Sequence, residues 1–476
     1  MSRTSVQLLC VAIYALVCTL VGVWSLRRTH DRRDYFMAGR RLGGWVTGLG
    51  VFASTLSGFS FIGGPSLIYR QGFSSMWIVI TGPIAHAITF LVVARPLRRI
   101  AGEHDALSLP EAVAAHYGDR RTGLWTALVI IAGVLGYLGT QILAMANALQ
   151  VMLPGTLTLF QSAWIVTAVL LLYCTIGGSV AAAYTDVIQG LLMIVAAIGV
   201  SVCASRAFEG GYPAMLETLE ADDPGSAGAW GAFGLLGCLG WYLTFTLGSC
   251  GQPHAITRLM MTRSLKDLRV AFPLVVIAGM IGGLVWMSVG TTMRALVVSG
   301  SIEPLASADQ AAPAFLATQA PPLLAGLVFA GLLAASMSTA DGFLNIGAAA
   351  LVHDLPRGLG RNPGLGHVGR ARLATVGLCT AAFGIAIAWQ DLLGLLGVAA
   401  WGLFAAGLVP VIAIGFHWRR ATARAARWSL ATSLVVNLGL RLSGLGLPHH
   451  FDPGALALLT SLVVFVVVSF LARPES

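Results

Sequence analysis

Apolar runs of about 18 residues or more recur along the whole chain, each long enough to cross a bilayer as an α-helix. Short polar stretches rich in arginine separate them. The pattern predicts an all-α polytopic membrane protein with about thirteen spanning helices. Their approximate limits are 6–26, 42–70, 73–94, 124–151, 157–177, 180–206, 230–256, 270–298, 320–352, 373–390, 392–416, 427–446 and 453–472.

Composition excludes a soluble enzyme. The 476 residues are 57% hydrophobic and 10% charged, whereas a soluble globular protein has about 25% charged residues. The net charge of +9 does not indicate a nucleic-acid partner, because the basic residues lie in short loops between apolar runs. We therefore expect the lipid bilayer as partner and no nucleic acid. The seven cysteines form no C-x-x-C pair and fall in apolar stretches, which is typical of buried residues.

The basic residues also predict the orientation of the chain. With the N-terminus outside, 24 of the 29 basic residues fall in cytoplasmic loops or the C-terminal tail. Such an excess on the cytoplasmic side is the usual rule for multi-pass proteins. The longest outer loop, 207–229, is acidic. The stretch 6–26 is too long for a signal-peptide core, so we expect a retained helix in the plasma (inner) membrane.

Two predicted spans are interrupted by glycine and proline. The span 42–70 contains Gly58 and Gly63-Gly64-Pro65, and the span 230–256 contains Gly248, Gly251 and Pro253. The two spans lie five segments apart and run in opposite directions. Paired broken helices in two inverted halves are typical of the binding site of a secondary transporter. The alternative is that glycine and proline are simply common in membrane helices.

Two acidic residues, Asp186 and Asp341, lie inside apolar segments. A carboxylate at the bilayer centre costs about 2.5–3.5 kcal/mol, so both are candidate functional residues. Asp186 is alternatively a capping carboxylate at the interface, and Asp341 a carboxylate held by neighbouring hydroxyls. Ser338 and Thr339 are adjacent hydroxyls next to Asp341. Hydroxyls and open carbonyls suit a hard monovalent cation, although such hydroxyls often bond to their own helix.

Six ordered stretches resemble the sodium:solute symporter family, which includes proline, pantothenate, galactose and sialic acid carriers. They span about residues 34 to 345, and Phe61 to Pro65 is most similar to the proline and pantothenate branches. The stretches are Asp34-Tyr35-Phe36-Met37-Ala38-Gly39-Arg40, Phe61-Ile62-Gly63-Gly64-Pro65, Ser108-Leu109-Pro110-Glu111, Thr175-Ile176-Gly177-Gly178 with Thr185-Asp186-Val187-Ile188-Gln189-Gly190, Gly251-Gln252-Pro253-His254 with Arg258, and Met337-Ser338-Thr339.

The resemblance implies a LeuT-type core of two inverted five-helix repeats, at 42–206 and 230–416. One extra N-terminal helix with its loop (1–41) precedes the core and two C-terminal helices (427–476) follow it, within a single transporter domain. Sodium is the implied coupling ion. Its implied ligands are the carbonyls of Ala53, Leu56 and Ala335 and the hydroxyls of Ser338 and Thr339.

The resemblance gives Asp186 a place on the inward route of sodium, and Asp186 with Asp341 could hold a second cation or share a proton. The chain departs from several relatives at Thr55, where they carry an acidic residue. The implied substrate positions lie on the broken helices and the third core helix, and the aromatic ones could equally be packing residues. These positions are Ser57, Phe59, Ser60, Tyr137, Gln141, Trp241, Phe245 and Ser249.

The sequence therefore predicts a sodium-coupled symporter that imports a small organic solute, such as an amino acid or a monocarboxylate, by alternating access. We find no Arg or Lys deep in a predicted span, which disfavours multiply anionic solutes. The chain has no P-loop and no catalytic cluster with suitable spacing, so we expect neither an ATP-driven pump nor an enzyme. The alternative is a membrane sensor that binds solute without net transport. Solute identity, sodium stoichiometry and oligomeric state do not follow from the sequence.

Overall fold

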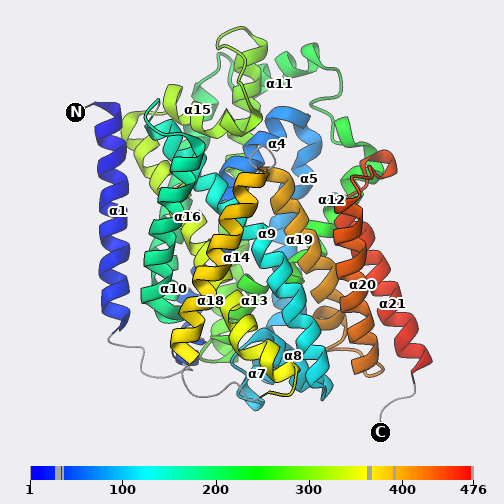
Figure 1. The fold of residues 1–476 in the computed structure, drawn as a ribbon. Coiled ribbons are helices and arrows are strands. Elements are labelled where there is room, and N and C mark those ends of the chain that lie inside the picture. The colour runs from blue at the N-terminus through cyan, green and yellow to red at the C-terminus, as the bar shows by residue number, and fades with distance from the viewer. Residues whose placement is uncertain are drawn as a thin grey trace.

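The computed structural model describes residues 2–26, 34, 37–153, 155–361, 367–389 and 393–472. Parts of the first family motif (Tyr35 and Phe36) and the side chains of Thr175 to Gly178 lie outside the described residues. Within the described ranges the chain forms a bundle of helices, drawn in Figure 1.

The helices of the first half follow one another with short connections. They are α1 (Arg3–Leu26), α3 (Gly44–Thr55), η2 (Phe59–Gly63), α4 (Gly64–Gln71), α5 (Met76–Val79), α6 (Thr81–Thr89), η4 (Phe90–Ala94), α7 (Arg95–Glu103), α8 (Leu109–Tyr117), α9 (Arg120–Met152) and α10 (Leu159–Arg206).

The second half of the bundle begins at α11, the helix that follows α10 in sequence. Its helices are α11 (Gly211–Asp222), α12 (Gly234–Gly248), η6 (Ser249–Gly251), α13 (Pro253–Met260), α14 (Leu265–Val298), α15 (Ala311–Thr318), α16 (Pro322–Ala349), η8 (Ala350–Asp354), α17 (Leu355–Gly358), α18 (His367–Ala388), α19 (Leu393–Leu408), η9 (Val409–Ile414), α20 (Ala423–Leu442) and α21 (Pro453–Leu471).

Ten helical stretches within the described residues are long and apolar enough to cross a membrane. The other three predicted spans have specific reasons to fall short. Helix α3 is only 12 residues long because its span is broken. The span 157–177 forms the start of α10, in which Leu159–Leu172 is the continuous run of described side chains. Helix α20 carries Arg424, Arg427 and Arg441.

Helix α10 joins two predicted spans, 157–177 and 180–206, in one assignment of 48 residues. At about 1.5 Å per residue it is more than twice as long as the hydrocarbon core is thick. Gln150, at the end of α9, donates to the carbonyl of Leu157 just before α10, and Tyr212 of α11 donates to the carbonyl of Ser201 near the end of α10.

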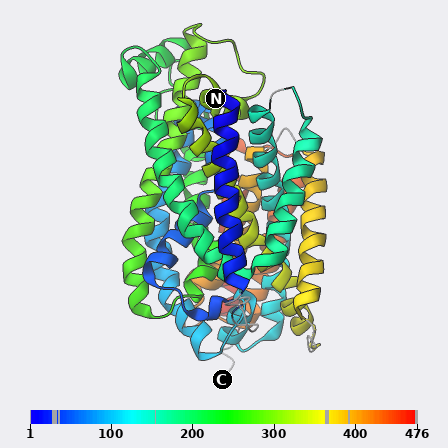
Figure 2. The ribbon, with the colours of Figure 1, turned by 90° about the vertical axis from the view of Figure 1, so that its left-hand side faces the viewer.

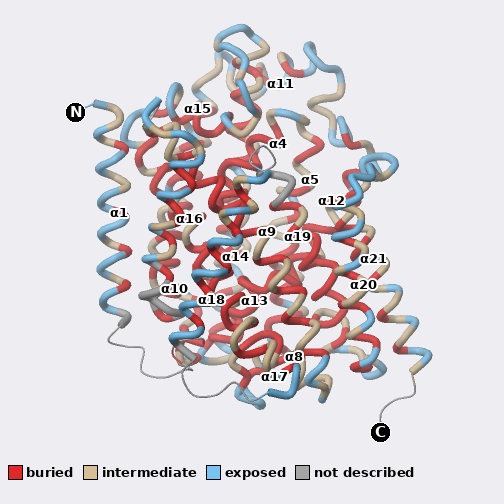
Figure 3. Tube along the Cα trace, viewed as in Figure 1, coloured by how far each residue is buried: buried red, intermediate tan, exposed pale blue. Residues whose placement is uncertain are grey.

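The termini lie at opposite ends of the bundle, and the N-terminus shares its end with α11 and α15 (Figure 1). Helix α1 runs along the outside of the bundle, as the view in Figure 2 shows. Its outer face exposes large apolar side chains such as Ile13 and Leu16. The buried residues concentrate along the centre of the bundle (Figure 3), where the broken helices lie.

Both predicted helix breaks are present. Helix α3 ends at Thr55, Leu56 is extended with ψ of 118°, and the chain resumes as the π-helix η2. Gly58 is required at this break, since a Cβ there would lie 2.4 Å from the Cβ of Ala144. Residues 63–65, by contrast, continue from η2 into α4.

The second break falls at one residue. Helix α12 passes through η6, Gln252 is extended with ψ of 105°, and Pro253 begins α13. Proline suits this first helical position, because it lacks the N–H that would have no helical partner there. The two breaks therefore place open backbone groups in the buried centre of the bundle.

Candidate functional site

The five residues predicted to hold sodium lie on two helices that contact each other, α3 and α16. The end of α3 supplies Ala53 and Leu56, and its last carbonyls have no partner within the helix. The Oγ1 of Thr339 donates to the carbonyl of Ser54 at 3.3 Å, which fixes the distance between the two helices. Ala335 lies one turn before Thr339, inside the continuous helix α16.

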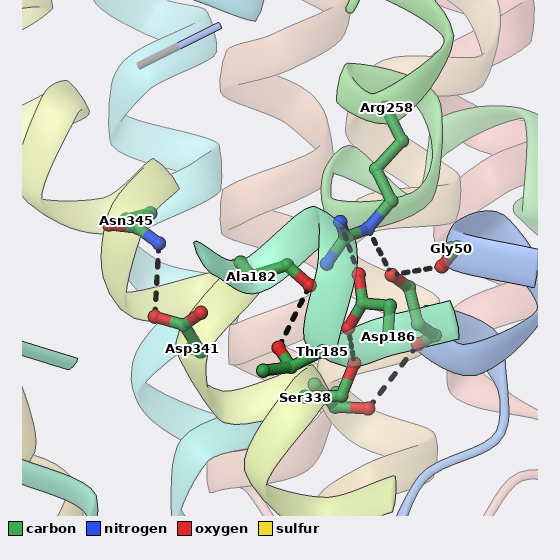
Figure 4. A network of polar contacts seen from close by, with 10 residues as sticks. Gly50, Ala182, Thr185, Asp186, Arg258, Ser338, Asp341 and Asn345 are labelled. Carbon is green, nitrogen blue, oxygen red and sulfur yellow. Dashed lines mark hydrogen bonds and ion pairs between the residues drawn. The ribbon is translucent and has the colours of Figure 1, made fainter. Parts of the chain in front are cut away.

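Ser338 belongs to a buried polar network that joins four helices (Figure 4). Its hydroxyl donates a hydrogen bond to one carboxylate oxygen of Asp186 on α10. The other carboxylate oxygen pairs with Nη1 of Arg258 on α13. The Nε of Arg258 donates to the hydroxyl of Ser54 on α3, and that hydroxyl donates to the carbonyl of Gly50 at 2.8 Å.

The buried position of Arg258 corrects the sequence analysis. Hydropathy placed Arg258 in a cytoplasmic loop, 257–269, and found no basic residue deep in a span. In the structure Arg258 lies on α13 and is only 4% exposed. A buried cation is tolerated when a carboxylate pairs with it, and Asp186 does so here. Asp186 is therefore not the interfacial capping residue that was its alternative reading.

Asp341 lies on α16 beside this network and is 2% exposed. The side-chain amide of Asn345, one turn further along the helix, donates a hydrogen bond to Asp341 at 3.0 Å. The structure thus gives Asp341 an amide partner, where the sequence suggested neighbouring hydroxyls. In Figure 4 Asp341 points toward Asn345, whereas Asp186 points toward Arg258 and Ser338. A second cation between them stays a prediction.

The donor set around the end of α3 fits a sodium ion. The Ser338 hydroxyl donates its hydrogen bond to Asp186, so the lone pairs of its oxygen remain for a cation. The open carbonyls of α3 add neutral oxygen ligands, and oxygen is the element that hard cations prefer. The guanidinium of Arg258 is held by Asp186 and Ser54, so it does not fill the place between α3 and α16.

A cavity lies next to the break in the first helix. Five of the eight predicted substrate residues line it. These are Phe59, Ser60, Tyr137, Phe245 and Ser249. Phe59 and Phe245 stack with ring centroids 6.3 Å apart, so they form one aromatic wall. We call this space the central cavity.

The other three predicted substrate residues do not line the central cavity. Ser57 lies within 3.3 Å of the Tyr137 hydroxyl, and Gln141 accepts a hydrogen bond from the N–H of Gly58 at 2.9 Å. Both therefore hold the helix break in shape. Trp241 packs on Phe233 and Phe245 behind the wall.

Several residues that line the central cavity escaped the sequence analysis. Trp286, Trp401, His86 and Thr55 are among them. The indole N–H of Trp401 is buried and has no hydrogen-bond partner within the described residues. A tryptophan among small residues, in Val398-Ala-Ala-Trp401-Gly-Leu-Phe404, was the available signal. Thr55, the position of the family departure, donates to the carbonyl of Phe52 at 2.8 Å.

Broken helices facing a central cavity, beside a buried set of oxygen ligands, define a secondary transporter. A model of the sodium:solute symporter family matches residues 35–432. The chain belongs to this family, and its function is sodium-coupled symport of a solute, with Na⁺ as the coupling ion. The resemblance seen in the six motifs is thereby confirmed.

Relatives of known function match over most of the chain. The high-affinity proline transporter PutP of Bacillus subtilis is 26% identical over 433 residues, which cover 88% of this chain and 87% of the relative. The sodium/proline symporter of Haemophilus influenzae is 29% identical over 447 residues, which cover 90% and 87%. These relatives are transporters, which accords with the expectation of no enzymatic activity.

Solved structures confirm the fold class. A sodium-coupled sialic acid symporter in a substrate-bound, outward-open state superposes with a TM-score of 0.79 at 21% identity, covering 98% of both chains. Mhp1, a nucleobase-cation-symport-1 family transporter in a closed conformation, gives a TM-score of 0.56 at 15% identity, covering 93% of this chain and 96% of Mhp1. The chain is thus a multi-pass membrane protein with the LeuT-type fold.

Proposed function

We propose that the transported solute is proline or another small zwitterion with an apolar body. The central cavity carries this proposal. Its wall is aromatic, with Phe59, Phe245, Trp286 and Trp401, and two hydroxyls, Ser60 and Ser249, lie among the rings. Such a pocket suits a small ring or aliphatic chain with few polar groups. The relatives named as proline transporters support the same class.

The carboxylate of the solute would be bound without an Arg or Lys side chain. His86 is the basic residue in the wall of the central cavity. The start of the second half-helix, near Gly58, carries a partial positive charge from the helix dipole. The indole N–H of Trp401 is a further unused donor. No Arg or Lys is among the residues that line the central cavity. A dicarboxylate would therefore bring one charge without a partner.

For sodium, we propose a site formed by the carbonyls of Ala53, Leu56 and Ala335 and the hydroxyls of Ser338 and Thr339. Asp186 then acts indirectly. It accepts a hydrogen bond from Ser338, which directs the lone pairs of that hydroxyl oxygen to the ion. Inward movement of the ion provides the driving force, at about 2.3 kcal/mol per charge for 100 mV.

We also propose that the end of the bundle with the N-terminus, α11 and α15 faces outward in the plasma (inner) membrane. The acidic α11 segment on one end and the arginine-rich connections on the other support this orientation.

Uptake into proteoliposomes tests the proposed solute. Radiolabelled proline should accumulate when an inward sodium gradient is imposed, and should not when potassium replaces sodium. A dicarboxylate should neither accumulate nor compete. Sodium-driven uptake of a dicarboxylate without any uptake of neutral or zwitterionic solutes would contradict the proposal. Sodium-dependent solute binding without accumulation would favour a sensor instead.

A further inference from the structure

A second, narrower cavity lies between α13 and α16 on the side of the bundle that carries α8. Each helix contributes one continuous face, with residues spaced by three and four positions as on one side of a helix. The residues are His254, Thr257, Arg258 and Met261 on α13 and Gly342, Asn345, Ile346 and Ala349 on α16. We call this cavity the inner groove. Gly342, Asn345 and Ile346 are only half-buried, so the groove is accessible from this side.

The α13 wall of the inner groove contains polar groups without partners. His254 is 2% exposed, and neither of its ring nitrogens has a hydrogen-bond partner within the described residues. The hydroxyl of Thr257 is equally buried and unpaired in that part of the chain. Buried polar groups in native proteins are almost always hydrogen-bonded. Two residues with unpaired polar groups in one cavity therefore indicate a ligand.

Arg258 adds a positive charge to the same wall. Its Nε and Nη1 are engaged by Ser54 and Asp186, away from the groove. Its Nη2 lies only 3.9 Å from the point where a Cβ on Gly342 would stand, so this nitrogen faces the groove. Figure 4 shows the guanidinium between α13 and the α10 carboxylate.

The opposite wall offers acceptors. Asn345 donates its amide N–H to Asp341 at 3.0 Å, which leaves its carbonyl oxygen for another group. Behind it the carboxylate of Asp341 has no ion pair within the described residues. One wall is therefore rich in donors and carries a cation, whereas the other presents an acceptor in front of an acid. This pattern matches the two ends of a zwitterion.

A thin aromatic layer separates the inner groove from the central cavity. Tyr137 lines the central cavity, and its ring centroid lies 6.1 Å from that of His254, which lines the groove. Phe343 packs against both rings, at 4.8 Å from Tyr137 and 4.3 Å from His254. A solute that passed this layer would enter the groove next.

We propose that the inner groove is a second, release-side binding site for a small zwitterion. The carboxylate binds Nη2 of Arg258 with Thr257 and His254, and the ammonium group binds the Asn345 carbonyl in front of Asp341. The inference rests on the proposed class of solute. Because Arg258 also holds Asp186 and Ser54, a solute in the groove is linked to the network behind the sodium site.

Alkylation of an introduced cysteine tests the inner groove directly. Ile346→Cys places a thiol on its α16 wall, and the rate of maleimide labelling is measured in nanodiscs relative to the parent chain with its native cysteines. We expect proline to slow labelling. Acetate, which lacks the ammonium group, and prolinamide, which lacks the carboxylate, should each need about tenfold higher concentrations, because each loses one charge-assisted contact.

Variants decide whether the groove itself binds the probe. Thr257→Val and His254→Phe should each raise the half-protecting proline concentration about fivefold, as expected for one lost hydrogen bond. Thr291→Val is the matched control, since the Thr291 hydroxyl is also buried and unpaired within the described residues but lies on α14, outside the groove. It should leave protection unchanged.

Three outcomes would overturn the proposal. They are absence of protection by proline, protection by acetate or prolinamide at the same concentration as proline, and loss of protection in Phe245→Ala, since Phe245 lines the central cavity and not the groove. Sodium-driven proline uptake in the parent chain is measured in parallel. If uptake fails while the groove still selects the zwitterion, the proposed solute is wrong and the groove site stands. If uptake succeeds without protection, the groove site is wrong.

Discussion

The Oγ1 of Thr339 donates a hydrogen bond to the carbonyl oxygen of Ser54 across 3.3 Å. This contact joins the continuous helix α16 to the broken end of α3, which lie 285 residues apart in sequence. An ion bound between the two helices would take over part of this bond. At the proposed sodium site, ion binding and the contact between α3 and α16 would therefore share one hydroxyl group.

Removal of a hydroxyl ligand should weaken sodium binding. Ser338→Ala and Thr339→Ala are each expected to raise the sodium concentration for half-maximal uptake by about tenfold or more, because a contact to a charged group is lost. The measurement is the sodium dependence of proline uptake in proteoliposomes.

Thr375→Ala is a suitable control for these two variants. Thr375 is buried on α18, and its hydroxyl bonds only to the carbonyl of Ala371 in its own helix at 2.9 Å. Its sodium dependence should match that of the parent chain. If both α16 variants also matched the parent chain, sodium would bind elsewhere.

The proposed orientation is tested by cysteine labelling in cells. Arg41→Cys, at an exposed position before α3, should react with a membrane-impermeant maleimide only after the membrane is opened. Glu217→Cys, at an exposed position on α11, should react in intact cells. Labelling in the reverse order would overturn the orientation derived from the arginine distribution.

The indole N–H of Trp401 should contribute to solute binding. Trp401→Phe keeps an aromatic ring in the wall of the central cavity and removes a donor that has no other partner among the described residues. We expect the KM for proline to rise about two- to tenfold, since one hydrogen bond is lost, while sodium dependence changes little.

Trp428→Phe controls for the loss of an indole ring as such. Trp428 is 56% exposed on α20, away from the central cavity, and its replacement should leave KM unchanged. A KM in Trp401→Phe equal to that of the parent chain would remove Trp401 from the binding site.

The cluster around Glu111 should make stability depend on pH. Burial alone would raise the pKa of the Glu111 carboxyl, but hydrogen bonds from His353 and the Leu107 N–H, and the charge of Arg357, together hold this pKa below its usual value near 4.5. A carboxyl with a lowered pKa stabilises the fold above its ordinary pKa, and this contribution is lost as pH falls.

Glu111→Gln should therefore lower the melting temperature at neutral pH and flatten its decline in acid. Glu103→Gln is the control, because Glu103 is exposed and lies 4.0 Å from Arg99. Equal acid sensitivity of Glu111→Gln and the parent chain would show that the cluster does not contribute.

Local patterns predicted much of the fold, whereas the residues of the sodium site stay a prediction. Glycine and proline mark both helix breaks because they act on the backbone at their own positions. The burial of Arg258 was not predictable from hydropathy, since a charge two residues beyond a span can turn inward when an acid on another helix pairs with it.

The wall of the central cavity was harder to predict for the same reason. Trp401 meets Phe245 at 5.2 Å between ring centroids only because α19 and α12 pack together. Trp241 and Phe245 lie one turn apart on one helix, yet only Phe245 reaches the cavity. Which rings line a cavity depends on helix rotation and on partners far apart in sequence.

Asp341 provides the last prediction, because it is a buried acid whose charge has no ion-pair partner within the described residues. Asp186 is already neutralised by Arg258, so these three groups together carry one excess negative charge when both acids are ionised. Like charges at close range favour uptake of a cation or a proton.

If Asp341 binds a second sodium ion or a proton, Asp341→Asn should lose one coupled charge or its dependence on pH. Reversal potentials of proline transport measure the coupling. Asn345→Asp is not a suitable control, because it adds a charge. Asp222→Asn, at the exposed ion pair with Arg294, should leave the reversal potential unchanged. Unchanged coupling and an unchanged pH profile in Asp341→Asn would instead give Asp341 a structural role, as the acceptor that holds Asn345 at the wall of the inner groove.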